Sequence, residues 1–116
     1  MPKTRLLTEF GIGSSLRHRD YTAAARRALQ DALWRNSINL AELFGQPKEA
    51  MIIDVEIAAP DPDAVDTTAL ADVFPYGQVT VTAHKGGLDV PRPDGGTPTV
   101  IVNAAINVSL NLEPAK

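Results

Sequence analysis

Hydrophobic and polar positions alternate in four segments of the chain, and this period of two is typical of β-strands. The segments cover approximately residues 4–12, 49–60, 77–84 and 99–112. In the last segment, every second residue from Val100 to Leu112 is apolar, while Asn103, Asn107 and Asn111 occupy positions between them. Such alternation predicts strands with one buried face and one polar face.

A helical period replaces the alternation after the first strand. Apolar residues recur at helical spacing from Tyr21 to about residue 36, which predicts an amphipathic helix. Asp20 precedes it, and a carboxylate at this position accepts hydrogen bonds from the free amides of the first helical turn. On the polar side, Arg27, Asp31 and Arg35 are four residues apart and are therefore neighbours on the helix surface.

Two shorter helical segments complete the pattern. A helical turn is expected over residues 39–45, and a second helix near 66–73, with Asp66 as its N-cap and Pro75 as its stop. The resulting order is strand, helix, strand, helix, strand, strand. This order predicts a single α+β domain over residues 1–116, with two helices packed on one face of a four-stranded sheet.

The other face of the predicted sheet is polar. An antiparallel sheet often leaves one face to solvent, which is one explanation. The other is that this face lines the inside of a homo-oligomer with binding clefts between subunits, because two short helices are little cover for four strands. The residues assigned to the polar face are Glu9, Asp54, Glu56, Thr80, Thr82, His84, Asn103, Asn107 and Asn111.

Composition removes several classes of function. The net charge of −3 argues against nucleic acid or an anionic membrane as the main partner. The chain contains no cysteine, which excludes disulfides, thiolate catalysis and cysteine-based zinc sites. No apolar run approaches the roughly 20 residues of a membrane span, and the N-terminus lacks the pattern of a signal peptide. A cytoplasmic protein without a membrane partner is therefore expected.

The connection "GIGSSLRHRD", residues 11–20, is the main candidate binding loop. Gly11 and Gly13 would allow a sharp turn or a close approach to a ligand, and the N-terminus of the following helix attracts anions. The polar side chains that could hold a carboxylate or phosphate here are Ser14, Ser15, Arg17, His18 and Arg19, with Glu9 on the preceding strand. The alternative is a solvated connection. A dinucleotide site is not indicated, because the third glycine of that fingerprint is missing.

Catalytic and metal-binding patterns are sparse. Lys85 lies beside two glycines at a strand end, and a lysine can activate a serine nucleophile such as Ser14 or Ser15. Asp54 and Glu56 point to one side of a strand and could act as acid and base. The only histidines, at positions 18 and 84, lack the spacing of a metal site, so neither a metal nor a cofactor is expected.

The chain resembles the uncharacterised "lin 0512" family of conserved hypothetical proteins. The resemblance rests on "LLTEFGIG", "DYTAAARRAL", "FPYG" followed by a strand and "GGL", and "NAAINV". The N-terminal signature of the family is G-x-G-x-D-x-H-G. Gly11 and Gly13 match it, whereas Ser15, Arg17 and His18 stand where the family has aspartate, histidine and glycine. The resemblance therefore implies a site at this loop, but no aspartate–histidine pair.

In outline the order of elements is similar to the RidA/YjgF and chorismate-mutase type of α+β fold, and to one repeat of the cyanuric acid hydrolases. These similarities imply a homo-oligomer such as a trimer, with clefts between subunits. The expected function is binding of a small polar or anionic metabolite at the loop of residues 11–20 and at the subunit interfaces. Hydrolysis of a cyclic amide or imine is one form of it. A non-catalytic regulatory or structural subunit is the alternative.

Overall fold

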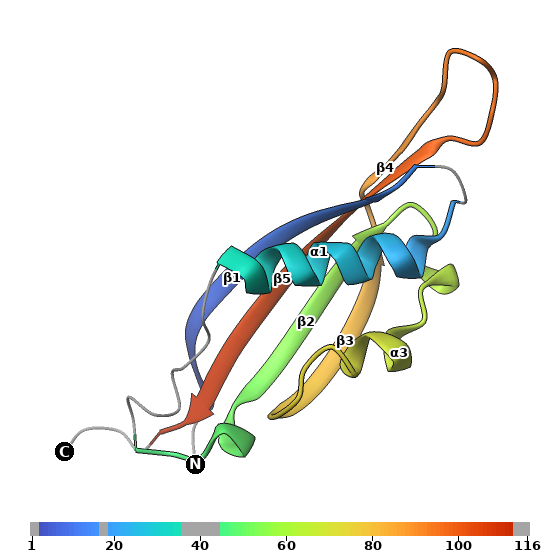
Figure 1. Cartoon of the computed structure of the whole chain (residues 1–116). Helices are drawn as coiled ribbons and strands as arrows, with labels where there is room; N and C mark the ends of the chain where they lie inside the picture. The colour runs from blue at the N-terminus through green and yellow to red at the C-terminus, as the bar shows by residue number, and fades with distance from the viewer. Residues whose placement is uncertain (1–2, 17–18, 36–44, 113–116) are drawn as a thin grey trace.

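The computed structural model describes residues 3–16, 19–35 and 45–112 (Figure 1). Its five strands are β1 (Lys3–Ser15), β2 (Ile52–Ala59), β3 (Gln78–Lys85), β4 (Leu88–Val90) and β5 (Thr99–Asn111). Its helices are α1 (Tyr21–Arg35) and α3 (Thr67–Ala71), with 3-10 turns η1 (Lys48–Ala50) and η2 (Pro62–Ala64). The α+β class is confirmed. The helical turn expected over 39–45 lies, except for its last residue, outside the described residues.

The strands form one mixed sheet in the order β1-β5-β2-β3. β5 is antiparallel to both β1 and β2, whereas β2 and β3 are parallel and are connected through α3. Both helices lie on the same face of the sheet, and β4 with the start of β5 forms an arm that projects from the body (Figure 1). We call the face without helices the open face.

The expected number of four strands is wrong, because the connection after β3 contains a strand of its own. Leu88–Val90 pairs antiparallel with Thr99–Ile101, and this short pairing makes β4. The segment is only three residues long. Its alternation is therefore too short to distinguish from a turn until its partner strand is known.

The core lies between the helices and the sheet. The alternation predicted for β5 is confirmed, because every second side chain from Val100 to Leu110 is buried. On β2, the side chains from Ile53 to Ala59 alternate in the same way. The side of α1 that faces them is rich in alanine, with Ala24, Ala25, Ala28, Leu29 and Ala32 buried. Burial of this apolar surface is the main favourable contribution to folding.

Both predicted helix caps are present. The Asp20 Oδ1 accepts a hydrogen bond from the backbone N–H of Ala23 at 2.9 Å. The Asp66 Oδ1 accepts one from the N–H of Ala69 at 3.0 Å. Each carboxylate thus satisfies an amide that has no partner within its own helix. The start of each helix was therefore predictable from a local pattern.

Gly11 and Gly13 do not lie in a turn, as the sequence suggested, but inside β1, which continues to Ser15. A Cβ atom on Gly11 would lie 1.9 Å from the carbonyl oxygen of Ala28, and one on Gly13 would lie 2.1 Å from that of Ala24. Neither distance is possible for a real side chain. The two glycines therefore allow the backbone of α1 to pack directly on the backbone of β1.

This close packing also reverses the faces expected for β1. Because only glycine fits beneath α1, the large side chains of Phe10 and Ile12 point to the open face, where they are 68% and 53% exposed. Glu9 pairs with Ile106, whose side chain is buried beneath the helices, so Glu9 belongs to the helix-covered face. Its assignment to the polar face is therefore wrong.

Candidate functional site

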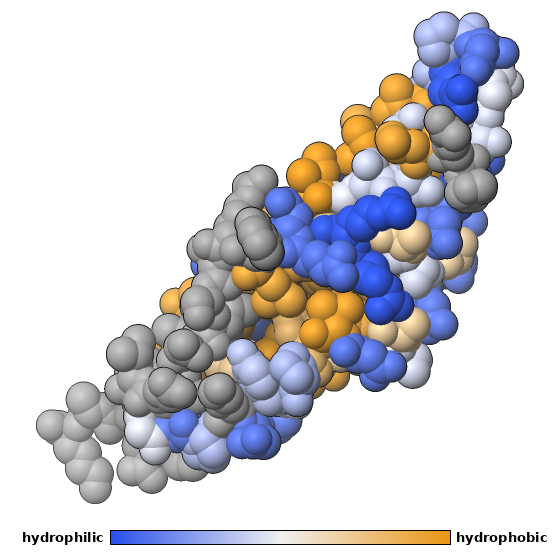
Figure 2. Space-filling view, in the orientation of Figure 1, coloured by the Kyte–Doolittle hydropathy of each residue, from blue (hydrophilic) through white to orange (hydrophobic). Residues whose placement is uncertain are grey.

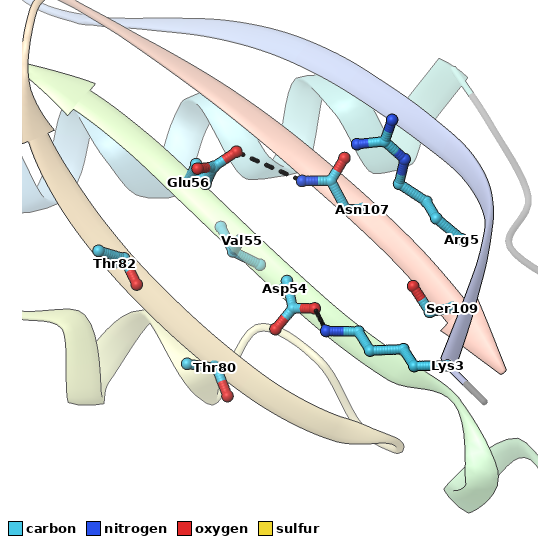
Figure 3. A pocket seen from close by; sticks show the side chains of 9 residues that line it. All are labelled: Lys3, Arg5, Asp54, Val55, Glu56, Thr80, Thr82, Asn107 and Ser109. Atoms are coloured by element: carbon cyan, nitrogen blue, oxygen red, sulfur yellow. Dashed lines mark hydrogen bonds and ion pairs between the residues drawn. The ribbon is translucent and has the colours of Figure 1, made fainter. Parts of the chain in front are cut away.

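The open face has a polar hollow of about 380 Å³ near the start of β1 (Figure 3). Four strands supply its side chains, so residues far apart in sequence meet on one surface. It is lined by Lys3, Arg5, Asp54, Val55, Glu56, Thr80, Thr82, Asn107 and Ser109. The sequence places five of these nine residues on the polar face, namely Asp54, Glu56, Thr80, Thr82 and Asn107. It does not predict that the two cations, Lys3 and Arg5, lie there as well.

A row of polar contacts crosses the sheet beside this hollow. The Thr8 hydroxyl donates to the Asn107 Oδ1 at 2.7 Å, and the Asn107 amide donates to a Glu56 oxygen at 3.4 Å. The other Glu56 oxygen lies 3.6 Å from the His84 Nε2. The row therefore runs from β1 through β5 and β2 to β3, and the Glu56 carboxylate lies between Asn107 and His84 in it.

The two cations of the hollow differ in their contacts. Lys3 Nζ lies 2.6 Å from the Asp54 Oδ2, so these two charges largely neutralise each other. Arg5 extends from β1 beside Asn107 (Figure 3), and among the described residues it has no hydrogen-bonding or ionic partner. A guanidinium presents a planar set of donors that matches a carboxylate or a phosphate. Arg5 is thus the available anion-binding group of this face.

The missed placement of Lys3 and Arg5 has a local cause. The register of β1 against β5 shifts between Arg5 and Leu7, where β1 contains a bulge. A bulge inserts one extra residue and exchanges the two faces of the strand beyond it. Lys3 and Arg5 therefore share the open face with Thr8 rather than with Leu7, which simple alternation does not predict.

Towards the arm, the open face is apolar. Phe10, Ile12, Leu88 and Val90 form an apolar patch, with Leu88 59% and Val90 38% exposed. The open face is therefore divided into a polar half, around the hollow of Lys3 and Arg5, and an apolar half.

Figure 2 shows the opposite, helix-covered side. Hydrophilic residues cover α1 and the tip of the arm there, while hydrophobic surface is visible along β1 towards the base of the arm.

A second hollow, of about 330 Å³, lies where the two halves meet. Phe10, Ala58 and Ala105 supply apolar surface there, while His84 and Glu56 supply polar groups. Glu56 borders both hollows. A ligand that extends from one to the other would therefore pass this carboxylate.

Arg19, predicted to bind a ligand, is already bound within the protein. Its Nε donates to the Tyr21 hydroxyl at 2.9 Å, and its terminal nitrogen donates to the Asp89 carboxylate at 3.1 Å. The Tyr21 hydroxyl also donates to Asp89 at 3.2 Å. The hydrogen bond with Tyr21 and, to a smaller extent, the one with Asp89 raise the pKa of Arg19 above its ordinary value. The cluster ties β4 to the start of α1. Arg17 and His18, the other predicted cations of this loop, lie outside the described residues.

The predicted serine–lysine pair is not assembled within one chain. The Ser15 side chain is buried, and its Oγ accepts a hydrogen bond from the backbone N–H of Asp20 at 3.2 Å. Ser14 lies on β1 and Lys85 at the end of β3, at opposite edges of the sheet. Two strands lie between β1 and β3, so three inter-strand spacings of roughly 4.8 Å separate these edges by about 14 Å. Within one chain, these residues are therefore too far apart to react together.

The described part of the chain contains no group of three or more histidines and carboxylates that could hold a metal ion. Within the same residues, no helix is long and apolar enough to cross a membrane.

A mixed sheet with both helices on one face and a half-polar open face defines a small α+β protein. The chain belongs to the Lin0512 family of conserved hypothetical proteins, whose model matches residues 5–108. It is similar to the crystal structure of an FtsZ-like protein of unknown function from Nostoc punctiforme PCC 73102, with 30% sequence identity and a TM-score of 0.87. That match covers 97% of this chain and 99% of the other. A search of the curated proteins finds no match. The family resemblance recognised in the sequence is therefore confirmed.

Proposed function

We propose that this protein binds a small anionic metabolite on the open face of its sheet, with Arg5 as the group that holds the anion. The observation that carries this proposal is the Arg5 guanidinium, which has no partner among the described residues and lies beside a hollow lined by hydrogen-bonding side chains. The site thus differs from the one expected from the sequence, since Gly11 and Gly13 are occupied by contacts with α1.

The charges of the hollow limit which ligands suit it. A carboxylate or phosphate bound to Arg5 would lie near the Asn107 amide and the Ser109 hydroxyl. Glu56 would repel a second anionic group but would accept a hydrogen bond from an amine, amide or imine nitrogen. The favoured ligand is therefore polar, with an anionic group at one end and a nitrogen donor towards its middle.

The homo-oligomer remains part of the proposal, and the apolar patch supports it. Soluble monomers rarely leave a large contiguous apolar patch in water. Phe10, Ile12, Leu88 and Val90 are all more than a third exposed and lie on one face. A second copy that covers this patch would also enclose the second hollow, of about 330 Å³, which Phe10 lines. A ligand that extends from Arg5 past Glu56 into this hollow would then be bound in a cleft between subunits.

Catalysis is compatible with this arrangement only between copies. A hydrolase of a cyclic amide or imine would need Ser14 of one copy near Lys85 of another, because Ser15 is buried and bound to the Asp20 amide. A non-catalytic regulatory or structural subunit, which needs no nucleophile, is the second candidate. Turnover of a cyclic amide that is lost in Ser14→Ala would favour the hydrolase.

Thermal-shift and calorimetric titrations with a panel of carboxylates and phosphate esters test the binding site. We expect at least one ligand to stabilise the wild-type protein and its Kd to rise 10- to 100-fold in Arg5→Ala, since a charge-assisted hydrogen bond contributes about 1.5–3 kcal/mol. Arg26→Ala, on α1 at the other side of the sheet, is the matched control and should bind normally. Equal binding by wild type and Arg5→Ala would refute the site.

A further inference from the structure

The two edges of the sheet are treated differently by the rest of the protein. The edge strands are β1 and β3 (Figure 1). On β1, the Asp31 carboxylate accepts a hydrogen bond from the outward N–H of Ile12, and Arg27 donates one to the outward carbonyl of Ser14. Side chains of α1 therefore occupy backbone groups that would otherwise pair with another strand.

The outward groups of β3 can be assigned from the bonds at its two ends. The Gln78 N–H donates to the Met51 carbonyl at 2.8 Å, and the Gly86 N–H donates to the Ala59 carbonyl at 2.9 Å. Even-numbered residues thus face β2, and the N–H and C=O groups of Val79, Val81 and Ala83 point outward because these directions alternate along a strand. Within the described ranges, no side chain is bonded to them as Asp31 and Arg27 are bonded to β1.

The side chains of β3 are also incompletely covered. Val79, Val81 and Ala83 are only half-buried against the helices, whereas Ile53, Val55 and Ile57 beside them on β2 are at most 1% exposed. On the open face, Thr80 and Thr82 are exposed. An additional strand along this edge would bury the remaining apolar surface and satisfy the outward backbone groups.

We propose that β3 pairs antiparallel with β3 of a second copy of this chain about a two-fold axis, which joins the two sheets into one. The strand "QVTVTAHK" is complementary to itself in this orientation. The two registers with the greatest overlap set Thr80 opposite Thr82 or Thr82 opposite its counterpart, and a shorter overlap sets Thr80 opposite its counterpart. Cross-strand threonine pairs stabilise a sheet.

The charges on β3 also suit a second copy. Lys85 is the one permanently charged residue of the strand, and it lies at the end of it. With Thr82 opposite its counterpart, the two lysines are six residues apart along the strands, which is about 20 Å. This exceeds the screening length of roughly 8 Å at physiological salt, so their repulsion is small.

The proposed pairing has a consequence for the site, and this consequence rests on the proposed function. Thr80 and Thr82 line the polar hollow from the β3 side. Joining two β3 strands would therefore place the hollows of both copies on one continuous sheet face, separated by the paired strands. The pairing is also compatible with the expected trimer, since a three-fold axis with perpendicular two-fold axes makes a hexamer.

Disulfide cross-linking tests the interface directly, because the chain contains no cysteine. Even-numbered residues of β3 would form the non-hydrogen-bonded pairs, whose Cα atoms are about 4.5 Å apart and within disulfide range. We expect a covalent dimer from Thr82→Cys, from Thr80→Cys or from the double variant, depending on which register is formed. Thr97→Cys, exposed on the loop of the arm, is the control for random collision.

A second variant removes the backbone pairing itself. In Val81→Pro the outward N–H is lost without breaking a bond to β2, so the fold should remain while the edge no longer accepts a strand. Light scattering should then show a wild-type mass of at least twice 12.4 kDa and at least a halving of that mass in the variant. A monomeric wild type, or cysteines at 80 and 82 that cross-link no faster than the one at 97, would overturn the proposal. Neither result affects the Arg5 titration, so the two proposals can fail separately.

Discussion

The Asp31 carboxylate of α1 accepts a hydrogen bond from the backbone N–H of Ile12 in β1 at 3.0 Å. One helical turn earlier, Arg27 donates to the carbonyl of Ser14. The spacing of four residues indicated that these two side chains are neighbours on the helix. The structure adds that both reach the edge of a 13-residue strand, which they protect from pairing with another chain.

The double variant Arg27→Ala/Asp31→Ala should expose this edge. We expect a loss of about 1 kcal/mol of unfolding free energy for each hydrogen bond, together with increased self-association. Urea unfolding measures the first effect and size-exclusion chromatography over a range of concentrations measures the second. Arg26→Ala is the control on the same helix. A variant with unchanged stability and unchanged association would show that the edge contacts are dispensable.

Gly13→Ala should strongly destabilise the protein. The added Cβ would lie 2.1 Å from the Ala24 carbonyl oxygen, so the backbone of α1 would have to move away from β1. We expect a loss of about 3 kcal/mol, at the upper end for overpacking, because a backbone cannot change rotamer to relieve the contact. Gly96→Ala is the control, since its nearest contact is a flexible carboxylate oxygen at 3.1 Å. Similar melting temperatures for both variants would contradict the direct packing of the α1 backbone on β1.

Tyr21→Phe should weaken the link between β4 and α1 while leaving the aromatic ring in place. The hydroxyl contacts both Arg19 and Asp89, and its loss should reduce the unfolding free energy by about 1 kcal/mol.

Because the pKa of Arg19 is raised, its stabilising contribution is complete below the pKa of an unfolded arginine and is lost only at still higher pH. Arg19 therefore contributes no pH dependence near neutrality. Unfolding curves of the wild type and of Tyr21→Phe at several pH values between about 6 and 10 check this. A stability difference between the two proteins that disappears within this range would contradict it.

Ser14 and Ser15 should respond differently to replacement by alanine. Ser15→Ala removes the buried acceptor of the Asp20 N–H and should destabilise the protein by about 1 kcal/mol. Ser14→Ala removes a side chain for which no hydrogen bond is found among the described residues, and stability should be unchanged. Chemical denaturation of both variants makes the comparison. If Ser15→Ala were fully stable but had lost an activity, Ser15 would have to be a nucleophile after all.

The glycine-rich motif shows how a local pattern can be interpreted in two ways. Taken by itself, "GIGSS" predicts the start of a binding loop, because glycines permit both turns and close approach to a ligand. Close approach is indeed the reason for Gly11 and Gly13, but the approaching group is the backbone of α1. Nothing within the motif distinguishes a ligand from a helix that begins at Tyr21.

The sequence by itself determined the α+β class, the alternating buried residues of β2 and β5, and the capping aspartates at positions 20 and 66. These features depend on residues close together in the chain, so a local pattern is enough to predict them. Only the tertiary structure decided the faces and edges of the sheet. Alternation identifies residues that share a face, but not which face the helices cover, and a single bulge near Leu7 exchanges the two. The position of Arg5 on the open face and the unprotected edge at β3 follow from strand order and register, which are set by contacts between residues far apart in the chain.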